Sequence, residues 1–246
     1  LLLLPFLVAA CDLQPNLRSS ESLFRQTGEL IALSGGQAGA PAACVTCHGL
    51  NGEGNGRDAP RLAGQDAGYL QRQLDDFARG RREHAAMASI ARQLSEADRA
   101  KVTSYYAGLP LPSGQAEASA LSAKAHAVAS RLYHHGDASR GLPACATCHG
   151  EAGQGEGPAK PALAGQPAAY LASQLEAWRK GRRHNDPLDQ MLVVSRRLSD
   201  PEIHALAGFS SALPGQHPRE AREAFRAARH VGSRSDASAL LQRAGE

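Results

Sequence analysis

Hydrophobic side chains recur at helical spacing in two separate stretches of the chain. In each stretch they stand at positions i, i+4 and i+7, which places them on one face of an α-helix. The residues are Leu70, Leu74 and Phe77 in the first stretch and Leu171, Leu175 and Trp178 in the second. A glycine follows each stretch, at Gly80 and Gly181, and glycine commonly ends a helix. The pattern predicts two amphipathic helices of equivalent design.

Serine–acid pairs at N-cap spacing open two further predicted helices. The pairs are Ser95 with Asp98 and Ser199 with Glu202, the second a complete capping box, and their helices end near Leu109 and Leu213. Two more helices are predicted over Glu21–Leu33 and Ala120–His135. No segment alternates as a half-buried strand does, so the predicted fold is all-α, with about three main helices in each half. The long Gly- and Pro-rich loops between these helices are uncommon unless something else organises them.

The regularity of the pattern comes from an internal repeat. Cys44–Arg82 and Cys145–Arg183 align without gaps at an offset of 101 residues, and 21 of the 39 positions are identical. The offset then rises to 104, because the second copy carries three extra residues before Met191. We therefore predict two domains of one type, residues 12–112 and 113–213, joined by a Pro/Gly/Ser-rich linker near Pro110–Glu117.

The two ends of the chain lie outside the repeat. Residues 1–11 form an apolar run that ends in Ala9, Ala10 and Cys11. Such a run is too short for a transmembrane helix, which needs about 20 residues, and is typical of the end of a secretory signal peptide. It also resembles a bacterial lipobox, so Cys11 is a candidate lipidation site that would attach the protein to a membrane. Residues 214–246 form a C-terminal extension that is expected to be helical or partly disordered.

Composition narrows the function further. Hydrophobic residues make up 42% of the 246 positions, which excludes disorder as the main state. Basic and acidic residues nearly balance, and the formal net charge of +3 is too small for a typical nucleic-acid-binding protein. Only five Phe, five Tyr and one Trp are present, few for two cores of this size. A large apolar cofactor in each domain would take their place.

Each repeat carries a C-x-x-C-H motif, at Cys44, Cys47 and His48 and again at Cys145, Cys148 and His149. Two thiols at this spacing can attach to the two vinyl groups of one haem, and the histidine then ligates the iron. A redox dithiol on a thioredoxin-like fold would need a βαβ unit, which the sequence does not show, and it would not explain the histidine. Four cysteines could instead bind zinc, which leaves the other repeated motifs unexplained. We therefore predict two covalently bound haem c groups.

The second axial ligand is predicted from the two methionines of the chain. Met87 and Met191 occupy equivalent positions, each seven residues before the Leu-Ser that opens the last helix of its domain. We assign His48 and Met87 to one iron and His149 and Met191 to the other; thioether ligation raises the redox potential. His84 and His184 are the alternative ligands, since both lie close to these methionines.

Residues that support the haem are predicted from spacing. Pro60 and Pro161 each follow the motif histidine by 12 residues, and their carbonyl groups could accept its second N–H. Tyr69 and Tyr170 could bind a haem propionate or only pack in the core. Four arginines could neutralise propionates or be solvated charges at helix ends. They are Arg81, Arg82, Arg182 and Arg183, with Arg81 and Arg182 taken as the candidates.

Together these residues resemble the dihaem cytochrome c4 family, built from two class-I cytochrome c domains. The resemblance covers about residues 20–213 and rests on the paired C-x-x-C-H-G, P-x-L-A-G-Q, Tyr-Leu-x-x-Gln-Leu, Gly-x-Arg and Met…Leu-Ser motifs. It implies that each domain wraps a few helices around one haem, and that a pseudo-twofold axis relates the domains. It also implies an exported electron carrier of the bacterial periplasm and proline carbonyls that accept from the axial histidines.

The predicted function is a one-electron relay between respiratory redox partners, toward a terminal oxidase or reductase, and not an enzyme. One alternative is a cytochrome subunit of a dehydrogenase complex, whose partner is permanent. Another is a dihaem enzyme, such as a peroxidase or a thiosulfate-oxidising protein, which needs an exchangeable or unusual axial ligand. The predicted partners are membrane oxidase, reductase or dehydrogenase complexes, and no nucleic acid.

Overall fold

The computed structural model describes residues 20–111 and 121–215, and within these ranges the chain is helical. The first half contains α1 (Ser20–Ser34), α2 (Val45–His48), α3 (Ala67–Ala78), α4 (Ala85–Gln93) and α5 (Glu96–Gly108). The second half contains α6 (Ala123–His135), α7 (Ala146–His149), α8 (Ala168–Arg179), α9 (Gln190–Arg196) and α10 (Asp200–Ser211). Short 3₁₀ turns cover Gly36–Ala38, Ala40–Ala42, Ala138–Arg140 and Pro187–Asp189. In the described ranges, β-structure is limited to isolated bridges.

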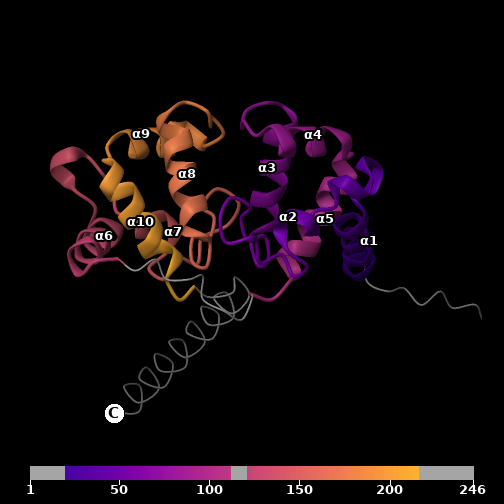
Figure 1. The fold of residues 1–246 in the computed structure, drawn as a ribbon, viewed down its shortest axis with the longest axis horizontal. Helices are drawn as coiled ribbons and strands as arrows, with labels where there is room; N and C mark the ends of the chain where they lie inside the picture. Colours follow the sequence, from indigo (N-terminus) through magenta and orange to yellow (C-terminus); the bar gives the residue numbers. More distant parts are fainter. Residues whose placement is uncertain (1–19, 112–120, 216–246) are drawn as a thin grey trace, which may run out of the picture.

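The two halves repeat one arrangement and stand side by side (Figure 1). In the first, α1 packs on α5, and α3 packs on α4 and α5; in the second, α6 packs on α10, and α8 packs on α9 and α10. The helices α3 and α8 face each other across the junction, while α1 and α6 lie toward the outer ends (Figure 1). The predicted all-α fold is confirmed.

Local sequence signals explain where the helices begin. The Ser95 side chain accepts from the backbone N–H of Asp98 at the start of α5. Ser199 and Glu202 form the predicted capping box at the start of α10. Such caps satisfy backbone N–H groups that have no partner inside the helix. Gly80 and Gly181 follow α3 and α8 with φ of 76° and 69°, in the left-handed region that glycine adopts without strain.

Each half has its own hydrophobic core. The first core contains Leu70, Val102 and Tyr106, and the second contains Leu132, Tyr133 and Ile203.

The outer helix of each half has a small residue where it packs against the last helix. A Cβ on Gly28 of α1 would lie 2.2 Å from the Lys101 carbonyl oxygen of α5. The equivalent residue of α6 is Ala129, which is fully buried.

Four of the helices in the described residues were not predicted from the sequence, which indicated about three main helices in each half. The C-x-x-C-H motifs form one-turn helices, α2 and α7, and the methionines lie on two further helices, α4 and α9. These segments are shorter than the window of about 11 residues that is needed to detect hydrophobic periodicity.

Cys11 and nearly all of the C-terminal extension lie outside the described residues, so the predictions for both ends stay predictions. Within residues 20–111 and 121–215, no helix combines the length and apolar character needed to cross a membrane.

Candidate haem-binding sites

Each C-x-x-C-H motif presents two thiols and an imidazole at the wall of one cavity. The first cysteine of each motif, Cys44 or Cys145, precedes the one-turn helix, and the histidine ends it. Residues three apart lie on one side of a helix, so both sulfur atoms of a motif face the same way. None of Cys44, Cys47, Cys145 and Cys148 forms a disulfide, so both sulfur atoms of each motif are available for covalent attachment to one group.

The two motif histidines are buried, and a proline carbonyl group orients each one. His48 Nδ1 lies 2.9 Å from the Pro60 carbonyl oxygen, and His149 Nδ1 lies 2.8 Å from that of Pro161. Burial lowers the pKa of both imidazoles, against the opposing effect of the proline hydrogen bonds. A neutral ring that donates from Nδ1 keeps the Nε2 lone pair free, as a metal ligand requires.

The alternate glycines of the motif loop let this loop pass close to the proline segment. Gly54 and Gly155 have φ of 84° and 74°. A Cβ on Gly54 would lie 2.7 Å from the Ala59 carbonyl oxygen, and one on Gly155 would lie 2.4 Å from the Ala162 nitrogen. No larger side chain fits there, so these glycines set the distance between histidine and proline.

A single cavity of about 1170 Å³ extends through both halves of the molecule. Small-molecule sites commonly measure about 300–1,000 Å³, so this one is large enough for more than one ligand. Both C-x-x-C-H motifs and both proline segments line it, together with Met87 and Met191. The cavity thus brings the four predicted iron ligands to one continuous wall.

Different groups hold the two methionines at the starts of their helices. His84 Nδ1 accepts from the Met87 backbone N–H at 3.3 Å, whereas an Asp186 carboxylate oxygen accepts from the Met191 N–H at 2.6 Å. His84 lines the cavity but is engaged as this cap, and His184 is exposed and does not line it. Both methionines line the cavity, and their assignment as the second iron ligands stays a prediction.

Tyrosine and arginine side chains pair across the junction between the halves. The Arg82 guanidinium donates to the Tyr170 hydroxyl at 2.8 Å, and Arg183 donates to the Tyr69 hydroxyl at 3.3 Å. The backbones of Arg82 and Arg183 form an antiparallel bridge at the same place. Burial raises the pKa of Tyr69, but the facing charges of Arg183 and Arg82 outweigh it and lower the pKa below its usual value.

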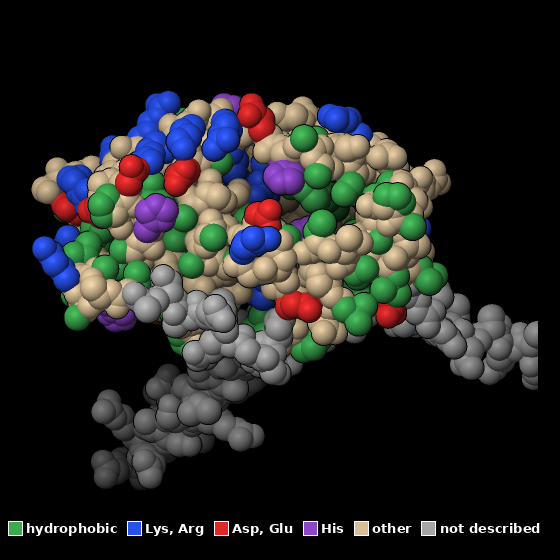
Figure 2. Space-filling view, viewed as in Figure 1, with side chains coloured by type: hydrophobic (Ala, Val, Ile, Leu, Met, Phe, Trp, Pro, Cys, Tyr) green, Lys and Arg blue, Asp and Glu red, His purple; other side chains and the backbone are tan. Residues whose placement is uncertain are grey.

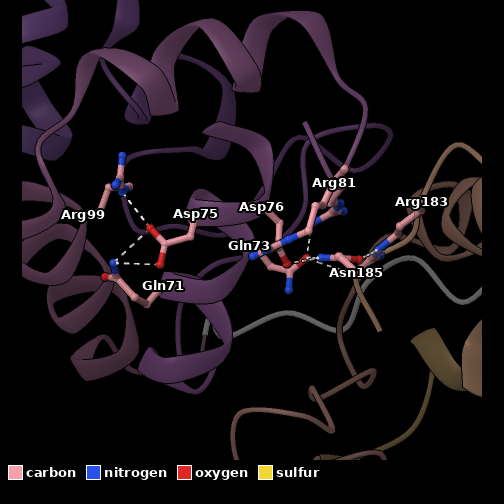
Figure 3. A network of polar contacts seen from close by, with 9 residues as sticks. Gln71, Gln73, Asp75, Asp76, Arg81, Arg99, Arg183 and Asn185 are labelled. Carbon is pink, nitrogen blue, oxygen red and sulfur yellow. Dashed lines mark hydrogen bonds and ion pairs between the residues drawn. The ribbon is translucent and has the colours of Figure 1, made fainter. Parts of the chain in front are cut away.

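A buried carboxylate belongs to the first half alone. Asp76, on α3, forms an ion pair with Arg81 and accepts from the Asn185 side-chain amide of the other half at 2.8 Å (Figure 3). Its side chain is only 2% exposed. The equivalent position in the second half is Ala177, which has no carboxylate and cannot make the same contact.

Comparison with known proteins identifies the two repeated units. The family model described as Cytochrome c matches residues 34–109 and 142–213. The chain belongs to the cytochrome c family. Both matched segments of this cytochrome contain one C-x-x-C-H motif, at Cys44–His48 and Cys145–His149.

The chain is similar to thiosulfate dehydrogenase electron acceptors and to cytochromes c4. A curated thiosulfate dehydrogenase electron acceptor from Stutzerimonas stutzeri is 43% identical over 187 residues, which cover 74% of this chain and 84% of the relative. The structure of a thiosulfate dehydrogenase (TsdBA) from Marichromatium purpuratum matches with a TM-score of 0.69 and 40% identity over 77% of this chain, which spans 40% of that chain. Reduced recombinant cytochrome c4 from Pseudomonas stutzeri matches with a TM-score of 0.66 and 30% identity, over 77% and 98% of the two chains.

The cytochrome therefore holds two haem c groups, one on each cysteine pair, and it is an electron-transfer protein. The cavity fits these groups in chemistry as well as size. The indole N–H of Trp178 and the side-chain N–H₂ of Gln73 line it, are buried and have no protein acceptor. Buried donors of this kind need an acceptor, and the propionate carboxylates of a haem would provide one.

The structure changes which arginines belong at the site. Arg81 pairs with Asp76, does not line the cavity and has a side chain that is 49% exposed; Arg182 is exposed at the cavity edge. Their neighbours Arg82 and Arg183 are the buried pair. Helical phase is lost at the glycine turns before them, so periodicity could not show which arginine turns inward.

Proposed function

We propose that this cytochrome accepts electrons from a thiosulfate dehydrogenase in the bacterial periplasm. The observation that carries the proposal is its 43% identity to a relative that bears the name of such an acceptor. A second acceptor of that name, from Thiomonas intermedia, is 42% identical over 174 residues. This function is closer to the dehydrogenase-subunit alternative than to a general respiratory relay.

In this proposal His48 and Met87 ligate one iron, and His149 and Met191 ligate the other. Each haem, when bound, would accept and release one electron at its iron. With a histidine and a methionine as ligands, neither iron would bind a substrate directly, which suits a carrier. The proline hydrogen bonds keep both imidazoles neutral and oriented, and Met ligation favours the reduced iron.

The exposed charge of the second half suits transient docking to an acidic partner. Lys and Arg side chains gather along the upper edge of the molecule, mostly over α8 and α9 (Figure 2). Lys180, Arg182, Arg196 and Arg197 are exposed in this region. Association steered by such charges weakens with ionic strength, so the reduction rate should fall as salt is added.

The direct test mixes the oxidised holoprotein with a purified thiosulfate dehydrogenase and thiosulfate, without oxygen. We expect both haems to become reduced within catalytic turnover, and neither to be reduced when the enzyme or thiosulfate is omitted. A mitochondrial-type monohaem cytochrome at equal haem concentration serves as the control for non-specific reduction. Reduction no faster than that of the control would reject the proposal.

A second candidate function is a general carrier toward a terminal oxidase or reductase. The match to cytochrome c4 over 98% of that protein's length favours it. Reduced holoprotein supplied to oxidase-containing membranes would then support oxygen consumption. If it does so while the thiosulfate dehydrogenase fails to reduce it, the second function replaces the first.

Lipid attachment at Cys11 stays a separate proposal, because it rests only on the lipobox-like sequence Val8–Cys11. The intact mass of the mature protein from its native host tests it. A diacylglyceryl-cysteine N-terminus supports an anchored carrier, and an unmodified one rejects the anchor without affecting the redox function.

A further inference from the structure

Two equivalent glutamines reach across the junction between the halves. They are Gln65 and Gln166, the last residues of the two P-x-L-A-G-Q motifs, and each is 3% exposed. The Gln65 side-chain N–H₂ donates to the Ala162 carbonyl oxygen at 2.8 Å, and its oxygen accepts from the Ala162 N–H at 3.2 Å. Gln166 makes the same pair of bonds to the Arg61 backbone, at 2.8 and 3.0 Å.

The peptide held in this way is the one that orients the motif histidine of the same half. The carbonyl of Pro161 accepts from His149, and the N–H of that same peptide, on Ala162, donates to Gln65. The order of groups is therefore imidazole, proline carbonyl, peptide N–H, and glutamine oxygen of the opposite half. The equivalent series of hydrogen bonds in the first half runs from His48 through the Pro60–Arg61 peptide to Gln166.

Hydrogen bonds in such a chain polarise one another in a low-dielectric interior. An acceptor on the N–H side of a peptide makes its carbonyl a stronger acceptor. A stronger acceptor at Nδ1–H makes the imidazole a more electron-rich ligand. An electron-rich ligand favours the ferric iron, so each glutamine should lower the potential of the haem in the half that it reaches, not in its own.

We propose that Gln65 and Gln166 are positioning residues that act in trans: each sets the redox potential of the haem held by the opposite domain, through that domain's proline peptide. The inference rests on the axial roles proposed above for His48 and His149. It goes beyond the proposed function, because it holds whichever protein donates the electrons. A glutamine that only joined the halves would not single out one haem.

The test replaces Gln65 by methionine, which keeps the volume and removes both polar atoms. Midpoint potentials of the two haems are followed separately in the holoprotein by NMR, from the axial methionine methyl signals. The M87H variant removes one signal and so assigns both. Gln65→Met should raise the potential of the His149 haem and leave that of the His48 haem unchanged, and Gln166→Met should do the reverse.

Gln71→Met is the matched control. Gln71 is a half-buried glutamine of the first half whose side chain hydrogen-bonds to Asp75 and Thr103 of the same half. It should shift neither potential. A shift confined to the haem in the glutamine's own half, an equal shift of both haems, or no shift at all in Gln65→Met would overturn the proposal.

Gln65→Glu keeps the test decisive if the methionine variant does not fold. Its carboxylate retains an acceptor for the Ala162 N–H but lacks the donor to the Ala162 carbonyl. The potential of the His149 haem should then stay at or below its wild-type value; a rise contradicts the proposal. Loss of both methyl signals would instead report failed ligation, which bears on the proposed iron ligands and not on the glutamines.

Discussion

The two halves build the same pocket from different residues, and the clearest case is the tyrosine beside each first cysteine. In the first half Tyr106, on α5, fills this space, and in the second half Tyr133, on α6, does so. The positions equivalent to them hold small residues, Ser210 and Ala32, both buried. A duplicated fold therefore conserves the volume around its cofactor while the helix that supplies the volume changes.

A second difference lies at the junction. Two features there are one-sided: the Asp76 carboxylate and the Arg61 guanidinium. Arg61 bridges the carbonyl oxygens of two equivalent alanines, Ala63 and Ala164, and burial lowers its pKa to about 10. The backbone contacts across the junction are nearly symmetric, whereas the charges are not, so the two haems lie in unequal electrostatic surroundings.

The largest expected effect comes from truncating equivalent core residues, Leu132 on α6 and Ile31 on α1. Leu132 is fully buried and Ile31 is 6% exposed. Each change to alanine removes buried methyl groups and leaves a cavity, at a cost of about 2–5 kcal/mol of unfolding free energy. We expect Leu132→Ala to cost more, and guanidinium unfolding of the holoprotein measures both. The fluorescence of Trp178, the one tryptophan, reports on the second half.

If Ile31→Ala also lowers the midpoint of the Trp178 transition, by an amount that matches its own cost, the halves unfold as one unit. If it leaves this transition in place, the halves unfold separately and the junction contributes little.

The next effect tests the one-sided carboxylate. Asp76→Ala leaves the buried Asn185 amide without one acceptor, which should cost about 1–3 kcal/mol. The cost should appear in the Trp178 transition of the second half, although Asp76 belongs to the first. Asp75→Ala is the control, because Asp75 pairs with Arg99 of its own half at 2.9 Å (Figure 3). Equal responses of the Trp178 transition to both changes would show that Asp76 does not stabilise the junction.

The tyrosines predict a smaller and unequal pair of effects. The Tyr133 hydroxyl donates to the Gly150 carbonyl oxygen at 2.8 Å, so Tyr133→Phe should cost about 1 kcal/mol. The Tyr106 hydroxyl is buried beside Cys44 and makes no hydrogen bond within the protein, so Tyr106→Phe should cost less. Urea unfolding of the two variants compares them. A larger cost at Tyr106 would contradict this prediction.

The smallest effect concerns Arg140, which binds both carboxylate oxygens of Glu202, at 2.8 and 3.1 Å. The first half has Gly39 at that place and lacks this pair. The Arg140 hydrogen bonds lower the pKa of Glu202. A carboxyl with a lowered pKa stabilises the fold above the unfolded value of about 4.3, and this stability is lost as the pH falls through the folded value.

Arg140→Ala should therefore weaken the second half at neutral pH and make no difference in acid, where Glu202 is protonated. Unfolding free energies at neutral and acidic pH check this. A cost that does not change with pH would mean that Arg140 acts through packing or through the Arg197 carbonyl, to which it also donates.

Much of the site could be predicted from the sequence because the residues that interact there lie close together along the chain. The spacing of 12 residues from His48 to Pro60 predicted a hydrogen bond that the structure contains, and the Ser95 and Ser199 caps lie where their motifs indicated. The glutamines were visible as part of a repeated motif, but nothing in a one-dimensional pattern shows that Gln65 reaches the other half. The Asp76–Asn185 contact depends on two chain segments that meet only after folding.

Ligation of one haem in each half by histidine and methionine can be tested by a potentiometric titration of the holoprotein with NMR and absorption spectra. We predict two low-spin haems, two resolved axial methionine signals in the reduced protein, and uptake of one electron by each haem at different midpoint potentials. A high-spin ferric haem in the resting protein, or a single methionine signal, would contradict this ligation.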